Sequence, residues 1–177
     1  MPVDSTLPPG PAALSDTAAP QAPPPVPGLN TLAAAALGTR SALAEVLAYS
    51  HRFVTVYCRA ALGASPSADL LAAEVCATLA TGWPTAHTQR RDFLEFVHAT
   101  ASRAVALGRW ESPHTYPLGP VTDMQREILL LRAIVGLSPM ETAVALRIPV
   151  LTVHRETSGA LAAAKRANRS HRGRVVA

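Results

Sequence analysis

The chain has 177 residues and a formal net charge of +4 at pH 7, with 49% hydrophobic residues but only 5% aromatic ones. That length suits one domain or two small ones, and the many alanines among the apolar residues favour packed helices, so we expect an all-α fold. No apolar stretch approaches the ~20 residues that span a bilayer, and the first residues lack the basic segment of a signal peptide. The composition therefore predicts a cytoplasmic protein with no membrane partner.

Residues 1–30 form the first segment, a Pro/Ala-rich tail. They contain nine of the 16 prolines, two acids and no basic residue. Too little apolar bulk is present for this segment to fold alone, and its prolines favour an extended chain. We predict a disordered, dispensable tail, with a docking segment as the alternative.

Residues 31–110 are predicted to form a helical domain. The apolar spacing predicts helices over Leu29–Leu62, Asp69–Thr81 and Asp92–Arg109. Gly82, Trp83 and Pro84 are expected to end the second helix, and Thr85–Thr88 is expected to be a loop. Trp83 itself is predicted to be a core residue, with base stacking as the alternative.

The two cysteines, Cys58 and Cys76, lie inside these apolar helical patterns. Neither belongs to a CxxC motif or to a paired Cys/His spacing, which indicates buried thiols rather than a zinc site. No metal and no cofactor is predicted.

Residues 111–121 contain Pro113, Pro117, Gly119 and Pro120 and are predicted to be a short linker. After it, Thr122–Gln125 has the spacing of a capping box, and Ser138–Glu141 has it again, with Pro139 at the first helical position. Four residues are expected on one buried helical face: Ile128, Leu131, Ile134 and Val135.

Residues 122–168 are predicted to form a helix-turn-helix domain. Arg147, Ile148 and Pro149 break the chain before a last helix over Val150–Ala167. In such modules the start of the last helix reaches base edges in the major groove while basic groups around it hold phosphates. The DNA-binding candidates are Thr152, His154, Arg155, Thr157 and Ser158 near the start of this helix and Lys165 and Arg166 near its end.

The positive charge is concentrated toward the carboxyl end. From Thr142 onward there are seven Lys and Arg residues against one acid, Glu156. A basic end of this kind predicts a polyanionic partner, with a solubilising tail as the alternative. Residues 169–177 form a basic tail whose arginines are expected to contact phosphate without reading sequence.

Several phrases of the chain resemble the bacterial extracytoplasmic-function sigma factors of the sigma-70 family. Tyr57–Gly63, Asp69–Cys76 and Phe93–Ala101 resemble region 2 of that family, and Met124–Arg132 with Gly136–Ala143 resembles region 4. The order and spacing of these blocks match over residues 40–168, and the D-type group of actinobacteria is the most similar.

The resemblance implies two small helical domains that direct core RNA polymerase to promoter DNA. The front domain would bind polymerase through Asp69, Leu70 and Glu74 and open the −10 element, where Arg90 and Arg91 would hold backbone phosphate. The back domain would read the −35 element. An anti-sigma factor is a further partner that the family implies, and no catalysis is expected.

The chain departs from the family pattern at several positions. Leu70 replaces a carboxylate, Ala73 replaces a glutamine, and Gly159 stands where a basic residue is usual. Arg147 takes the place of a glycine before the last helix, at a cost of about 1 kcal/mol in a left-handed turn, so a different turn shape is expected. These departures, with the short linker, leave a second hypothesis: a sigma-derived DNA-binding or polymerase-binding regulator that does not initiate by itself.

An enzyme is the third hypothesis, with Glu95 and His98, or Asp69 and Glu74, as candidate acid or base. No GxSxG, P-loop or HExxH motif supports it. Charged residues on helix surfaces explain these side chains, so no enzyme is predicted.

Overall fold

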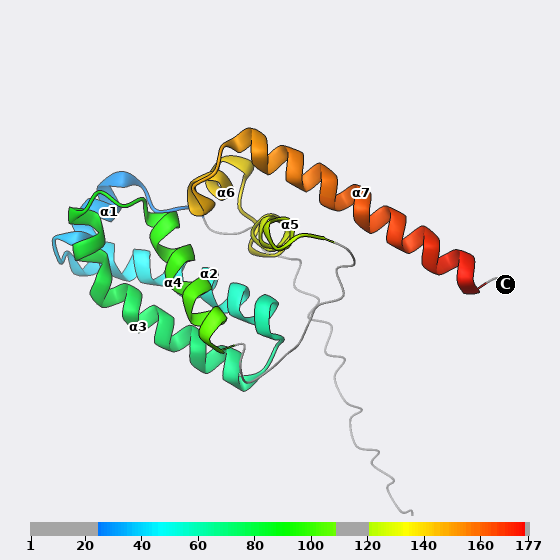
Figure 1. Cartoon of the computed structure of the whole chain (residues 1–177). Helices are drawn as coiled ribbons and strands as arrows, with labels where there is room; N and C mark the ends of the chain where they lie inside the picture. Colours follow the sequence, from blue (N-terminus) through cyan, green and yellow to red (C-terminus); the bar gives the residue numbers. More distant parts are fainter. Residues whose placement is uncertain (1–24, 109–120, 176–177) are drawn as a thin grey trace, which may run out of the picture.

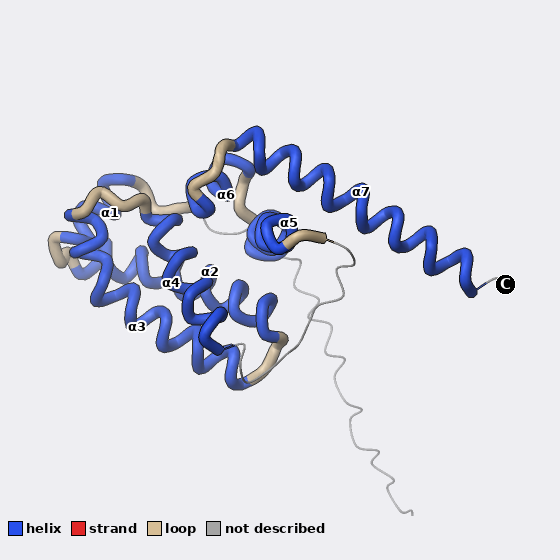
Figure 2. The backbone as a smooth tube through the Cα atoms, viewed as in Figure 1, coloured by secondary structure: helices blue, strands red, loops and turns tan. Residues whose placement is uncertain are grey.

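The computed structural model describes residues 25–108 and 121–175, with side chains described as far as Arg166. This part of the chain is helical and contains no strand, which confirms the all-α class (Figures 1 and 2). Four helices form the front half, residues 25–108: α1 Leu29–Ala36, α2 Arg40–Leu62, α3 Pro66–Thr88 and α4 Phe93–Gly108. The back half, residues 121–175, consists of α5 Asp123–Leu129, the π-helical turn η2 Leu130–Val135, α6 Pro139–Leu146 and α7 Val150–Val175.

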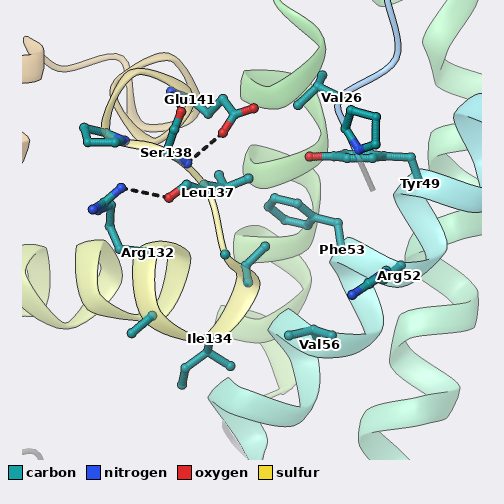
Figure 3. A pocket seen from close by; sticks show the side chains of 15 residues that line it. Val26, Tyr49, Arg52, Phe53, Val56, Arg132, Ile134, Leu137, Ser138 and Glu141 are labelled. Atoms are coloured by element: carbon teal, nitrogen blue, oxygen red, sulfur yellow. Dashed lines mark hydrogen bonds between the residues drawn. The ribbon is translucent and has the colours of Figure 1, made fainter. Parts of the chain in front are cut away.

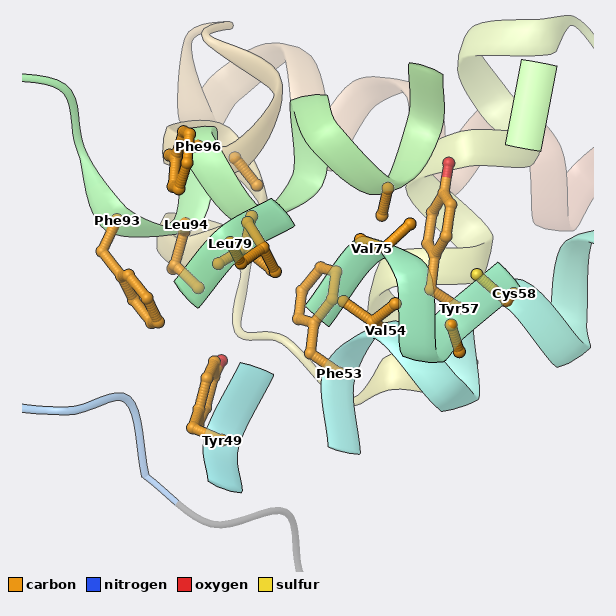
Figure 4. Close-up of a cluster of buried hydrophobic side chains, with 14 of the residues drawn as sticks. Tyr49, Phe53, Val54, Tyr57, Cys58, Val75, Leu79, Phe93, Leu94 and Phe96 are labelled. Atoms are coloured by element: carbon orange, nitrogen blue, oxygen red, sulfur yellow. The ribbon is translucent and has the colours of Figure 1, made fainter. Parts of the chain in front are cut away.

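The core of the front half lies where α2, α3 and α4 face one another (Figure 4). Val54, Cys58 and Val97 are fully buried there, and Phe53, Leu79 and Phe93 belong to the same buried cluster. The predicted stretch Leu29–Leu62 is two helices rather than one, because Gly38 takes a positive φ of 85° and turns the chain between α1 and α2.

The predicted end of the second helix at Gly82, Trp83 and Pro84 is wrong, because α3 continues to Thr88. Proline inside a helix costs about 3 kcal/mol. Burial of Trp83 offsets that cost: its indole Nε1 donates a 3.1 Å hydrogen bond to the carbonyl of Leu32, and its ring meets Phe93 edge-on at 5.2 Å. The core role of Trp83 is therefore confirmed, and the expected Thr85–Thr88 loop is the last turn of α3.

Both predicted capping boxes are present. Thr122 accepts from the backbone of Gln125 at the start of α5, and Ser138 accepts from that of Glu141 at the start of α6. The predicted buried face after α5 is only partly correct, because Ile134 is 53% exposed. The π-helical turn at Leu130–Val135 adds a residue per hydrogen bond and so rotates Ile134 away from the side on which Ile128 and Leu131 are buried.

The two halves pack against each other. Helix α6 lies along α4, and η2 lies along α2. Leu130, Leu131 and Leu137 belong to the same apolar cluster as the front helices, whereas Ile128 and Val153 form a smaller cluster within the back half. The predicted linker 111–121 lies outside the described residues except for Val121, and α7 extends away from the rest of the fold (Figure 1).

Candidate nucleic-acid interface

The first turns of α7 present a mainly polar side to solvent, with the exposed leucines Leu151 and Leu161 among the polar residues. Val153 and Ala160 are buried on the inner side of the helix. The predicted DNA-binding residues lie on the other side: His154, Arg155, Ser158, Lys165 and Arg166 are exposed, while Thr152 and Thr157 are half-buried. Thr157 donates through Oγ1 to the carbonyl of Val153 at 2.7 Å, so its hydroxyl is already used within the helix.

Helix α5 holds this face of α7 in place through a glutamine. Gln125 Nε2 donates to Glu156 Oε2 at 3.1 Å, and Glu156 Oε1 accepts from Arg155 Nε at 3.1 Å. The hydrogen bonds from Gln125 and then Arg155 lower the pKa of Glu156 below its ordinary value. A Cβ at Gly159 would lie 3.2 Å from Gln125 Nε2, so the small residue makes room for this contact.

The turn before α7 is left-handed, although it has an arginine, Arg147, where a glycine would fit that conformation without strain. Arg147 has φ 55° and ψ 42°, so the expectation of another turn shape is wrong. Backbone hydrogen bonds close this turn: the N–H of Ile148 donates to the carbonyl of Ala143 at 3.0 Å, as is usual where a helix ends in a left-handed residue. The side chain of Arg147 also reaches the front half, where Nη1 lies 3.5 Å from Glu95 Oε1 on α4.

The same carboxylate holds a second arginine. Arg91 Nη2 lies 3.2 Å from Glu95 Oε1, and its guanidinium carbon lies 5.6 Å from the ring centroid of Phe96. Arg91 and Arg147, from different halves, therefore share Glu95. Arg90 beside them is exposed, with a positive φ of 56° in the short turn between α3 and α4.

The predicted polymerase-binding residues lie on the exposed side of α3. Leu70 is 68% exposed and Glu74 is exposed beside it. Asp69 forms a two-point ion pair with Arg59 on α2, at 2.6 Å and 2.9 Å. The hydrogen bond from Arg59 is the main reason that the pKa of Asp69 is lowered.

A cluster that the sequence did not reveal joins α2, α4 and α5. Tyr57 Oη donates to Glu127 Oε1 at 2.6 Å, and His98 Nε2 lies 2.7 Å from the same oxygen. Because an ionised carboxylate only accepts, His98 Nε2 is the donor. Burial is the largest cause of a raised pKa at Tyr57, and the charge of Glu127 is the next.

His98 was a candidate base in the enzyme hypothesis, beside Glu95. Its partner is instead Glu127, 29 residues away, and it is buried. In the sequence, the only sign of this cluster was that each of the three helical segments has a polar residue at a position where the helical spacing predicts an apolar one. Among the described residues, no group of three or more His, Cys, Asp or Glu side chains is arranged to hold a metal ion.

Within residues 25–108 and 121–175, each helix is too short or too polar to cross a bilayer.

No protein-family profile matches the chain. The chain is similar to the ECF RNA polymerase sigma factor SigD of Mycobacterium bovis and of Mycobacterium tuberculosis, at 37% identity over 150 residues, covering 64% of this chain and 71% of the relative. Its fold is similar to that of CnrH, solved in complex with the cytosolic domain of CnrY, with a TM-score of 0.61 and 20% identity over 80% of this chain and 96% of CnrH. The chain therefore belongs to the extracytoplasmic-function (ECF) RNA polymerase sigma factors.

Proposed function

We propose that this chain binds core RNA polymerase in the cytoplasm and directs it to promoter DNA, with the start of α7 in the major groove of the −35 element. The observation that carries the proposal is the row of exposed polar side chains at the start of α7, supported from behind by Gln125 and Glu156. His154, Arg155 and Ser158 on that face have the donors and acceptors that read base edges. The chain is a binding protein in this scheme and catalyses no reaction itself.

Phosphate contacts would surround the base-reading residues. Lys165 and Arg166 follow the same side of α7 two turns later, and both are exposed. Thr152, half-buried at the first turn, suits a phosphate oxygen near the helix start. Arg90 and Arg91 lie at the turn before α4, where we place contacts to the −10 strand.

The packed halves must separate before both promoter elements are bound. Elements about 25 base pairs apart lie ~85 Å apart along a duplex at ~3.4 Å per base pair. Helices α4 and α6 are in contact, so this arrangement suits a resting state. Opening would release Arg147 from Glu95 and make its guanidinium group available to phosphate, while Arg91 would stay paired with Glu95 in the front half.

Polymerase binding is proposed for the outer side of α3, through Leu70 and Glu74 with Asp69. Leu70 offers an apolar contact where the family usually has a carboxylate. CnrH is solved with the cytosolic domain of CnrY. We propose an anti-sigma factor as a further partner of this chain.

Transcription in vitro tests the proposal directly. Purified chain and core polymerase should give promoter-specific run-off transcripts, and Arg155→Ala should reduce them while binding to random DNA changes less. Arg40→Ala, which removes the same charge from the exposed start of α2, is the matched control. DNA binding without initiation would support the alternative, a sigma-derived regulator. Equal loss for Arg155→Ala on promoter and random DNA would make Arg155 a phosphate contact.

A further inference from the structure

A groove of about 1030 Å³ lies between α2 of the front half and the η2–α6 segment of the back half (Figure 3). Tyr49, Phe53 and Val56 line one side, and Ile134, Val135 and Leu137 line the other. Its size is at the upper end of the ~300–1,000 Å³ usual for small-molecule pockets. It therefore has room for several residues of an extended chain.

Two of the charged side chains around the groove are paired with the backbone. Glu141 accepts from the backbone N–H of Ser138 at 2.7 Å, and Arg132 donates through Nη1 to the carbonyl of Leu137 at 3.0 Å (Figure 3). Ile134, by contrast, is 53% exposed on the rim. The lining therefore suits an apolar segment better than a small polar ligand, which needs unpaired donors and acceptors.

The start of the described chain lies in this same groove. Pro25 and Val26 are among its lining residues, and Val26 lies near Tyr49 in Figure 3. Residues 1–24 are joined directly to this position, so their local concentration at the groove is high without any second molecule. No other part of the chain outside the described ranges is connected to a residue that lines it.

The composition of residues 1–24 matches the groove. Seven of these residues are prolines, Leu7 and Leu14 supply bulky apolar side chains, and there is no basic residue to be repelled by Arg52 and Arg132. Proline-rich segments favour the extended polyproline conformation, which docks on grooves lined by aromatic and apolar side chains at low entropic cost. We propose that residues 1–24 of this chain occupy the groove between α2 and η2, and so bridge the front and back halves.

Methyl nuclear magnetic resonance on the full chain tests this proposal. A soluble nitroxide enhances the relaxation of exposed methyl groups, and the exposed side chains of Leu37 and Leu151 provide the reference. In the parent chain, the methyl groups of Ile134 and Val56 should show several-fold less enhancement than that reference. Nuclear Overhauser effects from proline ring protons to these methyl groups should also be present.

Two variants of the full chain remove the interaction from opposite sides. Combining Leu7→Ser, Leu14→Ser, Pro23→Gly and Pro24→Gly should raise the enhancement at Ile134 and Val56 several-fold. Ile134→Asp should do the same at Val56, and because Ile134 is exposed this change spares the buried core. Ser5→Thr, which leaves the prolines and leucines unchanged, is the control and should behave as the parent.

Three outcomes would overturn the proposal. Full enhancement at Ile134 in the parent chain would mean that the groove is open to solvent. Protection that persists in the four-residue variant would mean that another segment covers it. Protection that disappears on dilution of the parent would assign the groove to a second copy of the chain.

Discussion

The hydroxyl of Tyr57 donates a 2.6 Å hydrogen bond to Glu127 Oε1 across 70 residues of sequence. His98 of α4 shares the acceptor at 2.7 Å, so one carboxylate of α5 is held by two helices of the front half. Glu127 precedes Ile128, the fully buried residue at the centre of the back-half cluster. The cluster thus couples the packing of α5 to that of α2 and α4.

Tyr57→Phe should destabilise the fold by about 2 kcal/mol, as expected for loss of a hydrogen bond to a charged acceptor. Urea denaturation measures this free energy of unfolding. Tyr49→Phe removes the same atom from the same helix, where the hydroxyl faces the charge of Glu141 rather than making a hydrogen bond to it. Tyr49→Phe should therefore lower the free energy of unfolding by clearly less than Tyr57→Phe does. Equal losses for the two variants would show that the hydrogen bond between Tyr57 and Glu127 adds nothing to stability.

The stability of the fold should fall in alkaline solution. Burial raises the pKa of Tyr57 and of Tyr49 above the ordinary value of 10.0. Above pH 10 the unfolded chain therefore loses these protons while the folded chain keeps them, so unfolding becomes more favourable by up to about 1.4 kcal/mol per pH unit for each tyrosine. This stabilising contribution is fully present below pH 10. Denaturation curves between pH 9 and 12 should show a shallower slope for Tyr57→Phe, and an unchanged slope would contradict the prediction.

The two thiols should differ in reactivity. Burial is the main reason that the pKa of Cys58 is raised from 9.0 to about 11, and Cys76 is raised by burial as well but is only half-buried. Because only the thiolate reacts, iodoacetamide at pH 8 should modify Cys76 well before Cys58. Mass spectrometry of the labelled chain measures both rates. In Cys76→Ser the remaining reaction should be as slow as global unfolding, and rapid labelling there would show that Cys58 is accessible.

Glu95→Gln should strengthen binding to DNA. It removes the charge that holds Arg91 and Arg147, so both guanidinium groups become available to phosphate and the contact between α4 and α6 is weakened. Fluorescence anisotropy with a promoter duplex at low and high salt measures the effect, which should shrink as salt is added. Glu45→Gln removes the same charge at an exposed position of α2. Equal gains for both variants would reduce the effect to net charge alone.

Thr142→Val should stabilise the fold by about 1 kcal/mol, because a buried hydroxyl without a partner costs roughly that amount or more. Among the described residues, Thr142 Oγ1 is the buried side-chain polar atom that lacks a hydrogen bond. Thermal denaturation measures the change. Thr100→Val provides the comparison, since Thr100 donates to the carbonyl of Phe96 at 2.8 Å and should give no such gain. Destabilisation by Thr142→Val would indicate that the hydroxyl has a partner in solution.

Much of the local structure followed from short-range patterns. Thr122 with Gln125, and Ser138 with Glu141, interact over three residues, so a pattern in the sequence is enough to locate the starts of α5 and α6. The exposed placement of His154, Arg155 and Ser158 followed in the same way from helical periodicity.

The chain by itself determined its helical class, the starts of α5 and α6 and the exposed polar residues of α7, because caps and periodicity act between residues three or four positions apart. The tertiary structure decided that α3 continues through Pro84 and that Tyr57, His98 and Glu127 meet. Each of these depends on a partner far away in the sequence: Leu32 and Phe93 for Trp83, and Glu127 for Tyr57 and His98. Burial and pairing at such distances outweigh local propensities of about 1–3 kcal/mol, and no short segment of the sequence contains both partners.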